Sequence, residues 1–271
     1  MAVPLVINGA TRLYAIVGDP IGQVRSPETY TARMAAAGMN AVLLPMHVPS
    51  ERFDEVIPAI MGLANLDGLL VTVPFKARML RFATRTTPAA ASMGAVNALR
   101  RETDGSWSAD MFDGAGFVHA ALARGERLRG RRVLQFGAGG AGGAIVWALA
   151  EAGVASIRLV DPDSGRVRSL AASTRAAFPQ CDVAPATPSR EGFDMVVNAS
   201  PVGMKPGDGL PGDIGTLSAD TLVGEAVITE RGTALTELAE RHGCRWITGR
   251  EMHAGQIEAI MNFFATTRAR M

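Results

Sequence analysis

Cysteine is scarce in this chain: Cys181 and Cys244 are the only two among 271 residues. A disulfide-stabilised scaffold is therefore excluded, and the composition suits a reducing compartment, so we expect a cytoplasmic protein. Long apolar runs are also missing. None approaches the ~18 residues of a membrane span, and the N-terminal stretch lacks the basic start and apolar core of a signal peptide. We therefore expect no membrane partner.

An excess of charge of either sign is absent too. Lysine and arginine total 27, and aspartate and glutamate total 26. This balance provides no basic surface for nucleic acid, so no nucleic-acid partner is expected. No two of the four histidines have the spacing of metal ligands, so we expect no metal site. The 271 residues are enough for one large domain or two ordinary ones, and the apolar fraction of 48% is ordinary for a soluble globular protein.

Short apolar runs alternate with helical patterns in the first half of the chain. Residues 13–17, 41–48 and 69–73 are predicted strands. Helical patterns separate these strands, and the resulting β-α-β-α-β order predicts a mostly parallel sheet with helices on both faces.

Two serines are expected to begin the helices of this half. Ser26 precedes Pro27, which suits the cap and first turn of a helix that closes near Gly38. Ser50 is the expected cap of a second helix, and Pro58 is expected to kink or break it.

A second α/β unit is predicted to begin near Arg131. Its first strand, 133–136, leads into the glycine-rich stretch 137–143 and a helix over 144–151. Strands near 194–197 and 222–227 continue the unit. The chain closes with a helix whose apolar stripe contains Ile257, Ile260, Met261 and Phe264.

The stretch "GAGGAGG" is the candidate dinucleotide site. Glycines allow a pyrophosphate to approach the backbone, and a helix N-terminus offers unpaired N–H groups to the anion. The next strand ends in Asp161, where an acid accepts hydrogen bonds from the adenosine ribose of NAD. A carboxylate would repel the 2′-phosphate of NADP, so we expect NAD rather than NADP. Arg166 could soften this preference, although the pattern favours a solvated helix residue there.

One lysine stands in an unusual place. Lys76 follows the apolar run "LLVTVPF", where a surface lysine would be the ordinary interpretation. The stretches "GDPIGQVRSP", "VTVPFK", "GAVNAL" and "DMFDG" precede the glycine loop, and "NASPVGM" follows it. Together, in this order and over nearly the whole chain, they resemble the shikimate/quinate dehydrogenase family, which serves aromatic amino acid biosynthesis.

The resemblance implies a fold and a reaction. The fold is a two-domain α/β enzyme, with a three-layer α/β substrate domain over 1–115 and a Rossmann domain over 116–250. A terminal helix, 251–271, returns to the substrate domain. The reaction is a reversible hydride transfer between a ring-alcohol carboxylate and nicotinamide, in a monomer or homodimer.

The resemblance also assigns site residues, by motif position. Lys76 and Asp113 are the implied catalytic pair, because oxidation of an alcohol needs a group that takes the hydroxyl proton as hydride leaves. The implied substrate residues are Ser26, Thr72, Asn97 and Gln256. The implied cofactor residues are Gly137, Ala138, Gly139, Gly140, Ala141, Asp161, Asn198, Ala199, Ser200 and Gly249.

The sequence departs from the family where the substrate carboxylate should bind. The usual Ser-x-Ser-Pro has become Val24-Arg25-Ser26-Pro27, and Ile228 stands where the family has a tyrosine. Each lost hydrogen bond to a carboxylate weakens binding by roughly ten- to a hundredfold. Arg25 could replace the lost donors, and a solvated loop arginine is an equal alternative. Glu251-Met252 replaces the usual Gly-Met near the expected nicotinamide position.

Three interpretations follow. The leading one is an NAD-dependent dehydrogenase whose catalytic pair is kept and whose substrate end is rebuilt. The second is an ordinary NADP-dependent biosynthetic shikimate dehydrogenase. The third is a catalytically silent NAD-binding sensor, against which the retention of both Lys76 and Asp113 argues.

Overall fold

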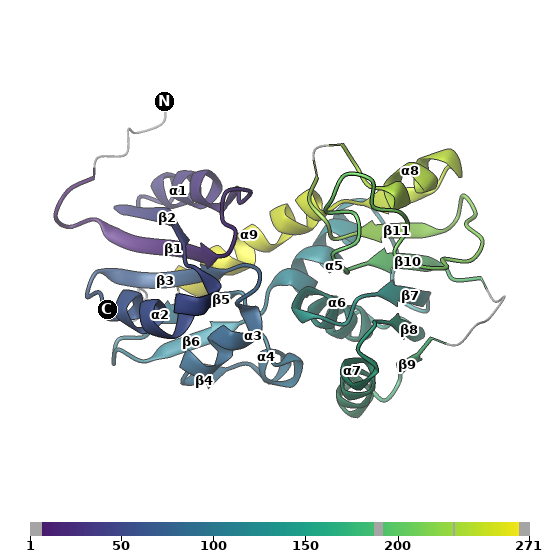
Figure 1. Cartoon of the computed structure of the whole chain (residues 1–271), viewed down its shortest axis with the longest axis horizontal. Helices are drawn as coiled ribbons and strands as arrows, with labels where there is room; N and C mark the ends of the chain where they lie inside the picture. The colour runs from purple at the N-terminus through teal and green to yellow at the C-terminus, as the bar shows by residue number, and fades with distance from the viewer. Residues whose placement is uncertain (1–6, 187–191, 230, 266–271) are drawn as a thin grey trace. The chain divides into compact units, whose positions relative to one another are not determined.

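The computed structural model describes residues 7–186, 192–229 and 231–265. The chain divides into two compact units (Figure 1). Unit 1 takes its described residues from 1–112 and 257–271, and unit 2 comprises 113–256. Each unit contains one six-stranded sheet, so the expected α/β class with two units is confirmed. The functional boundaries at 115 and 250 stay a prediction.

Unit 1 is built on a mixed sheet of order β2-β1-β3-β5-β6-β4. Its strands are β1 (Arg12–Gly18), β2 (Ala41–His47), β3 (Leu66–Val71), β4 (Arg85–Thr86), β5 (Ala98–Arg101) and β6 (Trp107–Asp110). β1 pairs in parallel with β2 and β3, and β4 pairs in parallel with β6, whereas β5 is antiparallel to both β3 and β6. The parallel strands β2, β1 and β3 all end at the same edge.

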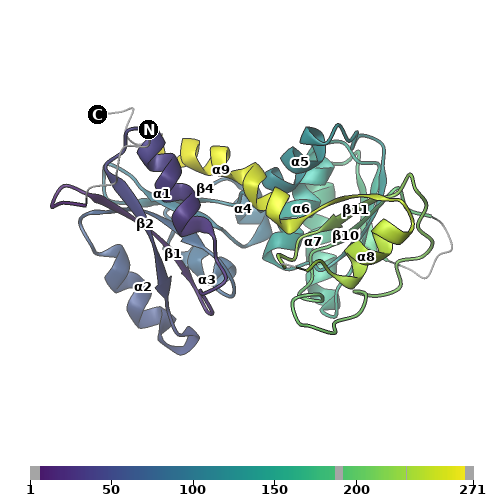
Figure 2. The ribbon, with the colours of Figure 1, turned by 90° about the horizontal axis from the view of Figure 1, so that it is seen from above.

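Helices cover both faces of this sheet. They are α1 (Ser26–Ala36), α2 (Phe53–Met61), α3 (Lys76–Met79) and α4 (Pro88–Met93), with 3₁₀ turns at Ser50–Arg52 and Leu80–Phe82. Figure 2 shows α1 on one face of the sheet and α2 and α3 on the other. Tyr30 and Met34 of α1 pack on Tyr14 and Ile16 of β1. On the opposite face, the rings of Phe53 and Phe75 lie 4.6 Å apart.

Unit 2 is a wholly parallel sheet of order β12-β11-β10-β7-β8-β9. Its strands are β7 (Arg132–Phe136), β8 (Ser156–Val160), β9 (Asp182–Pro185), β10 (Met195–Asn198), β11 (Leu222–Glu225) and β12 (Arg245–Ile247). Its helices are α5 (Asp113–Ala123), α6 (Gly140–Glu151), α7 (Ser164–Ala177) and α8 (Ala234–Arg241), and it holds the start of α9 (Gly249–Ala265). The order reverses between β7 and β10, and a parallel sheet binds ligands at such a switch point.

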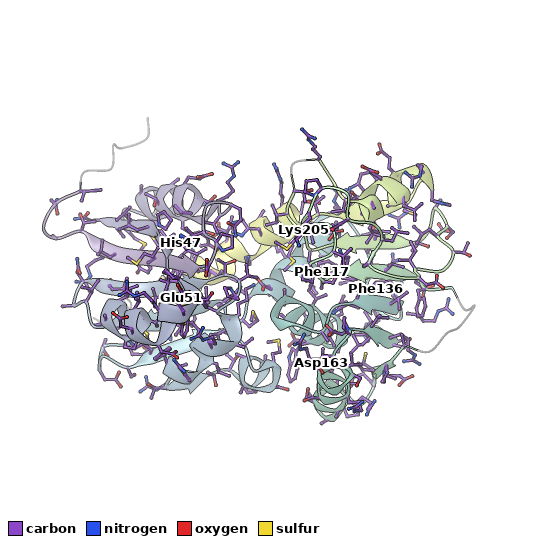
Figure 3. All side chains as sticks on the ribbon, in the orientation of Figure 1. His47, Glu51, Phe117, Phe136, Asp163 and Lys205 are labelled. Carbon is purple, nitrogen blue, oxygen red and sulfur yellow. The ribbon has the colours of Figure 1, made fainter. Side chains whose placement is uncertain are left out.

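Glycine allows helix and sheet to approach closely in unit 2. Phe117 of α5 is fully buried and lies over β11 (Figure 3). A Cβ on Gly224 of β11 would stand 2.5 Å from this ring, so the strand needs glycine there.

Several local expectations were wrong. β3 covers Leu66–Val71, so it begins and ends earlier than the expected 69–73. α6 begins at Gly140 rather than at 144. Helix α2 runs through Pro58, so the helix is not broken there, while the alternative of a kink stays a prediction. Each of these errors rests on a local propensity that tertiary packing overrides.

Neither expected serine cap forms. Arg25, not Ser26, is the N-cap of α1, and it makes no side-chain cap. Ser50 begins a 3₁₀ turn instead, and its hydroxyl donates to Asp19 at 2.7 Å. This contact joins residues 31 positions apart, so the local sequence pattern could not reveal it.

Helix α9 contributes to one hydrophobic core cluster in each unit. Met252, in its first half, belongs to the core of unit 2. Ile257, Ile260 and Phe264 belong to the core of unit 1. The predicted apolar stripe is therefore confirmed for these three residues. Among the described residues, no helix combines the length and apolarity needed to cross a membrane.

Candidate active site and dinucleotide site

The carboxyl end of β3 brings three of the predicted residues of unit 1 together. Thr72 directly follows the strand, and Lys76 begins α3. The carbonyl of Lys76 accepts a hydrogen bond from the N–H of Val96 at 3.0 Å, next to Asn97. Asn97 is buried, and its carbonyl accepts from the N–H of Val71 at 2.8 Å. Main-chain bonds thus fix all three residues at one edge of the sheet.

Asn97 also orients the chain that leads to Asp113. Its Oδ1 accepts a hydrogen bond from the N–H of Phe112 at 2.9 Å. Asp113 is the next residue, and it is buried at the start of α5. The predicted substrate residue Asn97 therefore positions the segment that carries the predicted catalytic carboxylate.

The first loop of unit 1 lies against Thr72. A Cβ on Gly18 would overlap the side-chain methyl of Thr72, so glycine is required at the start of "GDPIGQVRSP". Ser26, at the end of this stretch, is buried and does not cap α1. Arg25 is 67% exposed, and its Nη1 lies 3.5 Å from Glu28. The end of this loop therefore combines the buried Ser26 with the exposed side chain of Arg25.

Gln256 lies on α9 where α9 contacts α5. A Cβ on Gly116 of α5 would stand 3.0 Å from the Cβ of Gln256, and one on Gly255 would overlap the carbonyl of Gly116. Gln256 is buried, and its Nε2 lies 3.3 Å from Nδ1 of His253. Two glycines therefore bring the helix of Gln256 against the helix that begins with Asp113.

The glycine loop joins β7 to α6 and suits a dinucleotide phosphate. Gly137 has a φ of +94°, and a Cβ there would stand 2.5 Å from the carbonyl oxygen of Ala199. The predicted stretches 137–141 and 198–200 thus lie side by side. Gly139 is the N-cap of α6, and a Cβ there would meet nothing within 4 Å. The open space at a helix N-terminus fits a pyrophosphate.

Asp161 is tied to this loop. Its Oδ2 accepts a hydrogen bond from the N–H of Ala138 at 2.8 Å, and its Oδ1 accepts from the N–H of Asp163 at 2.9 Å. Asp163 caps α7 at its N-terminal end (Figure 3). Arg166 is not simply solvated, because its guanidinium lies 3.6 Å from both Asp161 and Asp163.

Asn198 holds the segment that follows β10 in place. It is buried at the end of β10, and its Oδ1 accepts from the N–H and the hydroxyl of Ser200 at 3.1 and 2.7 Å. Its Nδ2 donates to the carbonyl of Val202 at 2.8 Å and to Glu225 at 3.0 Å. The side chain of Asn198 thus shapes the predicted loop 198–200 from within.

Glu225 is a site residue that the sequence reasoning missed. It is buried at the end of β11 and accepts hydrogen bonds from Asn198, from the Thr233 hydroxyl at 2.7 Å and from the N–H of Val227 at 2.9 Å. Burial raises the pKa of its carboxyl above the ordinary 4.5. The available signal was an acid inside the apolar run 222–227.

Glu251 has a structural role at the start of α9. Its Oε2 accepts from the N–H of Thr248 at 2.9 Å, and its own N–H donates to the Thr248 hydroxyl at 3.2 Å. This reciprocal pair is a capping box. Burial opposes ionisation of Glu251, but hydrogen bonds from Arg124 and Thr248 lower its pKa. The predicted cofactor residue Gly249 stands in the same turn, where a Cβ would lie 2.9 Å from Ile228.

The chain is similar in sequence and fold to known proteins. Residues 16–99 match the shikimate dehydrogenase substrate binding domain. The shikimate dehydrogenase (NADP(+)) of Rubrobacter xylanophilus is 34% identical over 256 residues, which cover 93% of this chain and 89% of that protein. The shikimate 5-dehydrogenase of Listeria monocytogenes, solved with shikimate and NAD, is 25% identical with a TM-score of 0.83, covering 97% and 94% of the two chains. The quinate dehydrogenase of Corynebacterium glutamicum, solved with NAD, is 26% identical with a TM-score of 0.81, covering 94% and 93%.

The fold, the glycine loop and these likenesses define a nicotinamide-dependent dehydrogenase of the class that acts on a CH–OH group. More particularly, the chain belongs to the shikimate dehydrogenase family. The resemblance drawn from the sequence motifs is therefore confirmed.

Proposed function

We propose that this chain oxidises and reduces a shikimate- or quinate-like ring alcohol with NAD, and that Lys76 and Asp113 are its catalytic pair. One observation carries the proposal. The chain uses arginine for nearly all of its positive charge, and Lys76 and Lys205 are its only lysines. One of these two stands at the carboxyl end of β3 beside Thr72 and Asn97.

A lysine at this place can do what an arginine cannot. Arginine stays protonated in proteins, whereas an ammonium group can give up and regain a proton. In oxidation, Lys76 takes the proton of the ring hydroxyl, and in reduction it returns that proton to the same oxygen. Asp113 holds the ammonium in position, and Asn97, Thr72 and Gln256 bind the ring. Nicotinamide, when bound, accepts or supplies the hydride.

The cofactor preference rests on the turn after β8. Asp161 and Asp163 both lie 3.6 Å from Arg166, and Arg168 also acts on Asp163, so the preference depends on the place of Asp161 and not on net charge. The side chain of Asp161 is only 8% exposed and is held by two backbone N–H groups. A carboxylate fixed in this way accepts hydrogen bonds from ribose hydroxyls and repels a 2′-phosphate. NAD is therefore the proposed cofactor.

The substrate is proposed to be a ring alcohol whose carboxylate is held differently from the family pattern. Ser26 does not cap α1, and in this proposal its hydroxyl donates to the substrate carboxylate. Arg25 lies 3.5 Å from Glu28 in an exposed pair, and exposed pairs are weak. In this proposal Arg25 binds the substrate carboxylate through a bidentate contact.

NADP dependence is the second candidate. The relative from Rubrobacter xylanophilus is named an NADP(+) enzyme, and Arg166 could turn toward a 2′-phosphate. The test is a two-by-two assay of shikimate and quinate, each with NAD and with NADP. Turnover with NAD at a tenfold or greater advantage in kcat/KM supports the proposal. An equal advantage for NADP would establish the second candidate. Absence of turnover, with NADH binding intact, would indicate another alcohol or a sensor.

The role of Lys76 is tested by keeping its charge. Lys76→Arg should lower kcat by about 10²- to 10⁴-fold, because the proton transfer is lost. Binding of NADH, measured by fluorescence, should change less than twofold. Lys205→Arg is the matched control, since Lys205 is the other lysine and lies exposed beyond β10 (Figure 3). Full activity of Lys76→Arg would contradict the assignment.

A further inference from the structure

Gln135 is a polar residue in an apolar position. It lies in β7, which is flanked by β10 and β8, and its register partners are Val197 and Leu159. Its relative exposure is 0%. Strands in the middle of a parallel sheet are buried on both faces and are normally apolar throughout. A glutamine here therefore needs an explanation beyond the packing of the sheet.

The side chain of Gln135 makes both of its hydrogen bonds to the glycine loop. Its Nε2 donates to the carbonyl of Gly137 at 2.9 Å and to the carbonyl of Gly142 at 2.9 Å. Both partners are acceptors, so the amide nitrogen must face them. The other end of the amide, Oε1, is buried and has no partner among the described residues. A buried acceptor without a partner costs stability, so the residue is not there for the fold alone.

The two carbonyls belong to opposite ends of the loop. Gly137 leaves β7, and Gly142 lies in the first turn of α6. A Cβ on Gly142 would overlap the carbonyl oxygen of Gly137, so the two ends are already in contact. By donating to both oxygens, the amide ties the first residue of the loop to the first turn of α6. The N–H groups of that turn, which face an anion, are thereby held in a fixed place relative to the strand.

We propose that Gln135 is a positioning residue of the dinucleotide site, which clamps the carbonyls of Gly137 and Gly142 and so holds the loop in the shape that binds pyrophosphate. The inference rests on the proposed function in one respect, that unit 2 binds a nicotinamide dinucleotide through this loop. Gln135 itself need not touch the cofactor. It acts through the backbone of the loop.

The test replaces Gln135 with methionine, which has a similar length and no strong donor. We expect the Kd for NADH to rise about tenfold, because two hydrogen bonds that hold the loop are lost. The inhibition constant of ADP should rise by the same factor, since ADP carries the pyrophosphate. The inhibition constant of adenosine should stay within twofold. Thr174→Val is the matched control, because Thr174 is also buried in unit 2 and its hydroxyl has no partner among the described residues.

The outcomes separate the inference from the proposed function. Wild-type protein that binds neither NADH nor NADPH would remove the proposed function. Wild-type protein that binds NADH, with an unchanged Kd for Gln135→Met, would overturn the inference alone. An equal loss for ADP and adenosine would also overturn it, because the damage would then reach the whole adenosine site. Gln135→Leu is the second variant, and failure of both variants to fold would show that the glutamine serves the fold itself.

Discussion

Asp161 shows how one residue can serve both structure and specificity. Its carboxylate accepts the N–H of Ala138 in the glycine loop and the N–H of Asp163 in the following turn. It therefore fixes the loop whether or not a cofactor is present. Under the proposed function, the same carboxylate also accepts hydrogen bonds from the ribose of NAD and repels a 2′-phosphate. The sequence could predict the second role from spacing, whereas the first depends on a contact across 23 residues.

Removing the charge of Asp161 should change cofactor choice. For Asp161→Asn we expect the ratio of kcat/KM for NAD to that for NADP to fall by about ten- to a hundredfold, because one charged hydrogen bond is lost. Steady-state kinetics with both cofactors measures this ratio. Asp163→Asn is the control, since asparagine also caps helices and the neighbouring charge changes equally. We expect the ratio of this control to move less than threefold. Equal effects in both variants would mean that net charge alone decides.

At the scale of elements, the β7–loop–α6–β8 region was the most predictable. Strand, glycine loop, helix and acid follow one another within 30 residues, from Arg132 to Asp161. The start of α6 differs from the prediction because glycine is a poor helix former, so propensity places residues 140–143 in the loop. Here Gly142 must lack a side chain to pack on Gly137, and this packing outweighs propensity.

Other elements depend on contacts that no local pattern reveals. Ser50 looks like a cap, but Asp19 from the end of β1 takes its hydroxyl. Thr248 and Glu251 have the spacing of a capping box, and the structure shows its two hydrogen bonds. The family pattern instead implies a place for Glu251 near the nicotinamide. Glu225 is an acid within an apolar strand. Its role follows only from its hydrogen bonds with Asn198 and Thr233, which the sequence does not reveal.

The capping box should stabilise α9. Glu251→Ala leaves the N–H of Thr248 without its partner, so we expect a loss of about 1 kcal/mol in the free energy of unfolding. Urea denaturation measures this loss. Glu258→Ala is the control on the same helix: its pair with Arg33 is 2.9 Å long but 67% exposed, so the expected loss is below about 0.5 kcal/mol. A lowered affinity for NADH with unchanged stability would instead place Glu251 at the cofactor.

The network beneath loop 198–203 should respond to pH with a defined sign. Burial raises the native pKa of Glu225 above 4.5, so the native state holds its proton more tightly than the unfolded state. The stability from this group is complete below about 4.5 and declines as the pH rises through the native pKa. The Tm of the wild type should therefore fall relative to the Tm of Glu225→Gln as the pH increases from 4.

Glu126 provides a matched control of opposite sign. It is also buried in unit 2, but hydrogen bonds from Arg245 lower its pKa below 4.5. Its stabilisation is present above about 4.5 and is lost as the pH falls through the native pKa. The gap in Tm between wild type and Glu126→Gln should therefore shrink toward low pH. Parallel slopes for the two variants would contradict the assignment for Glu225.

At the scale of the whole molecule, α9 is an element that contributes to a core cluster in each unit. Its first half adds Met252 to the core of unit 2, and its second half adds Phe264 to the core of unit 1. Phe264 is nearly fully buried, with its ring centroid 4.8 Å from that of Tyr14. Arg100 holds the same end of the helix through the carbonyl of Phe263 at 2.7 Å. Loss of the Phe264 side chain should therefore destabilise unit 1 more than unit 2.

Phe264→Ala tests whether the two units open separately. A Phe-to-Ala change in a core costs roughly 3–5 kcal/mol, which is a large part of the stability of one domain. We expect hydrogen exchange to accelerate in β1 and β3 and to stay slow in β7 and β10, because each unit has its own core. NADH binding should persist while turnover falls, since Lys76, the proposed catalytic lysine, belongs to unit 1 and the glycine loop to unit 2.

Leu149→Ala is the reciprocal variant. Leu149 is fully buried in the core of unit 2, and its truncation should accelerate exchange in β7 and β10 while β1 and β3 stay protected. NADH binding should then weaken together with turnover. If both variants instead accelerate exchange equally in all four strands, the two units unfold as one cooperative body. In that case a ligand bound to either unit should stabilise the whole chain against unfolding, because it binds only the native state.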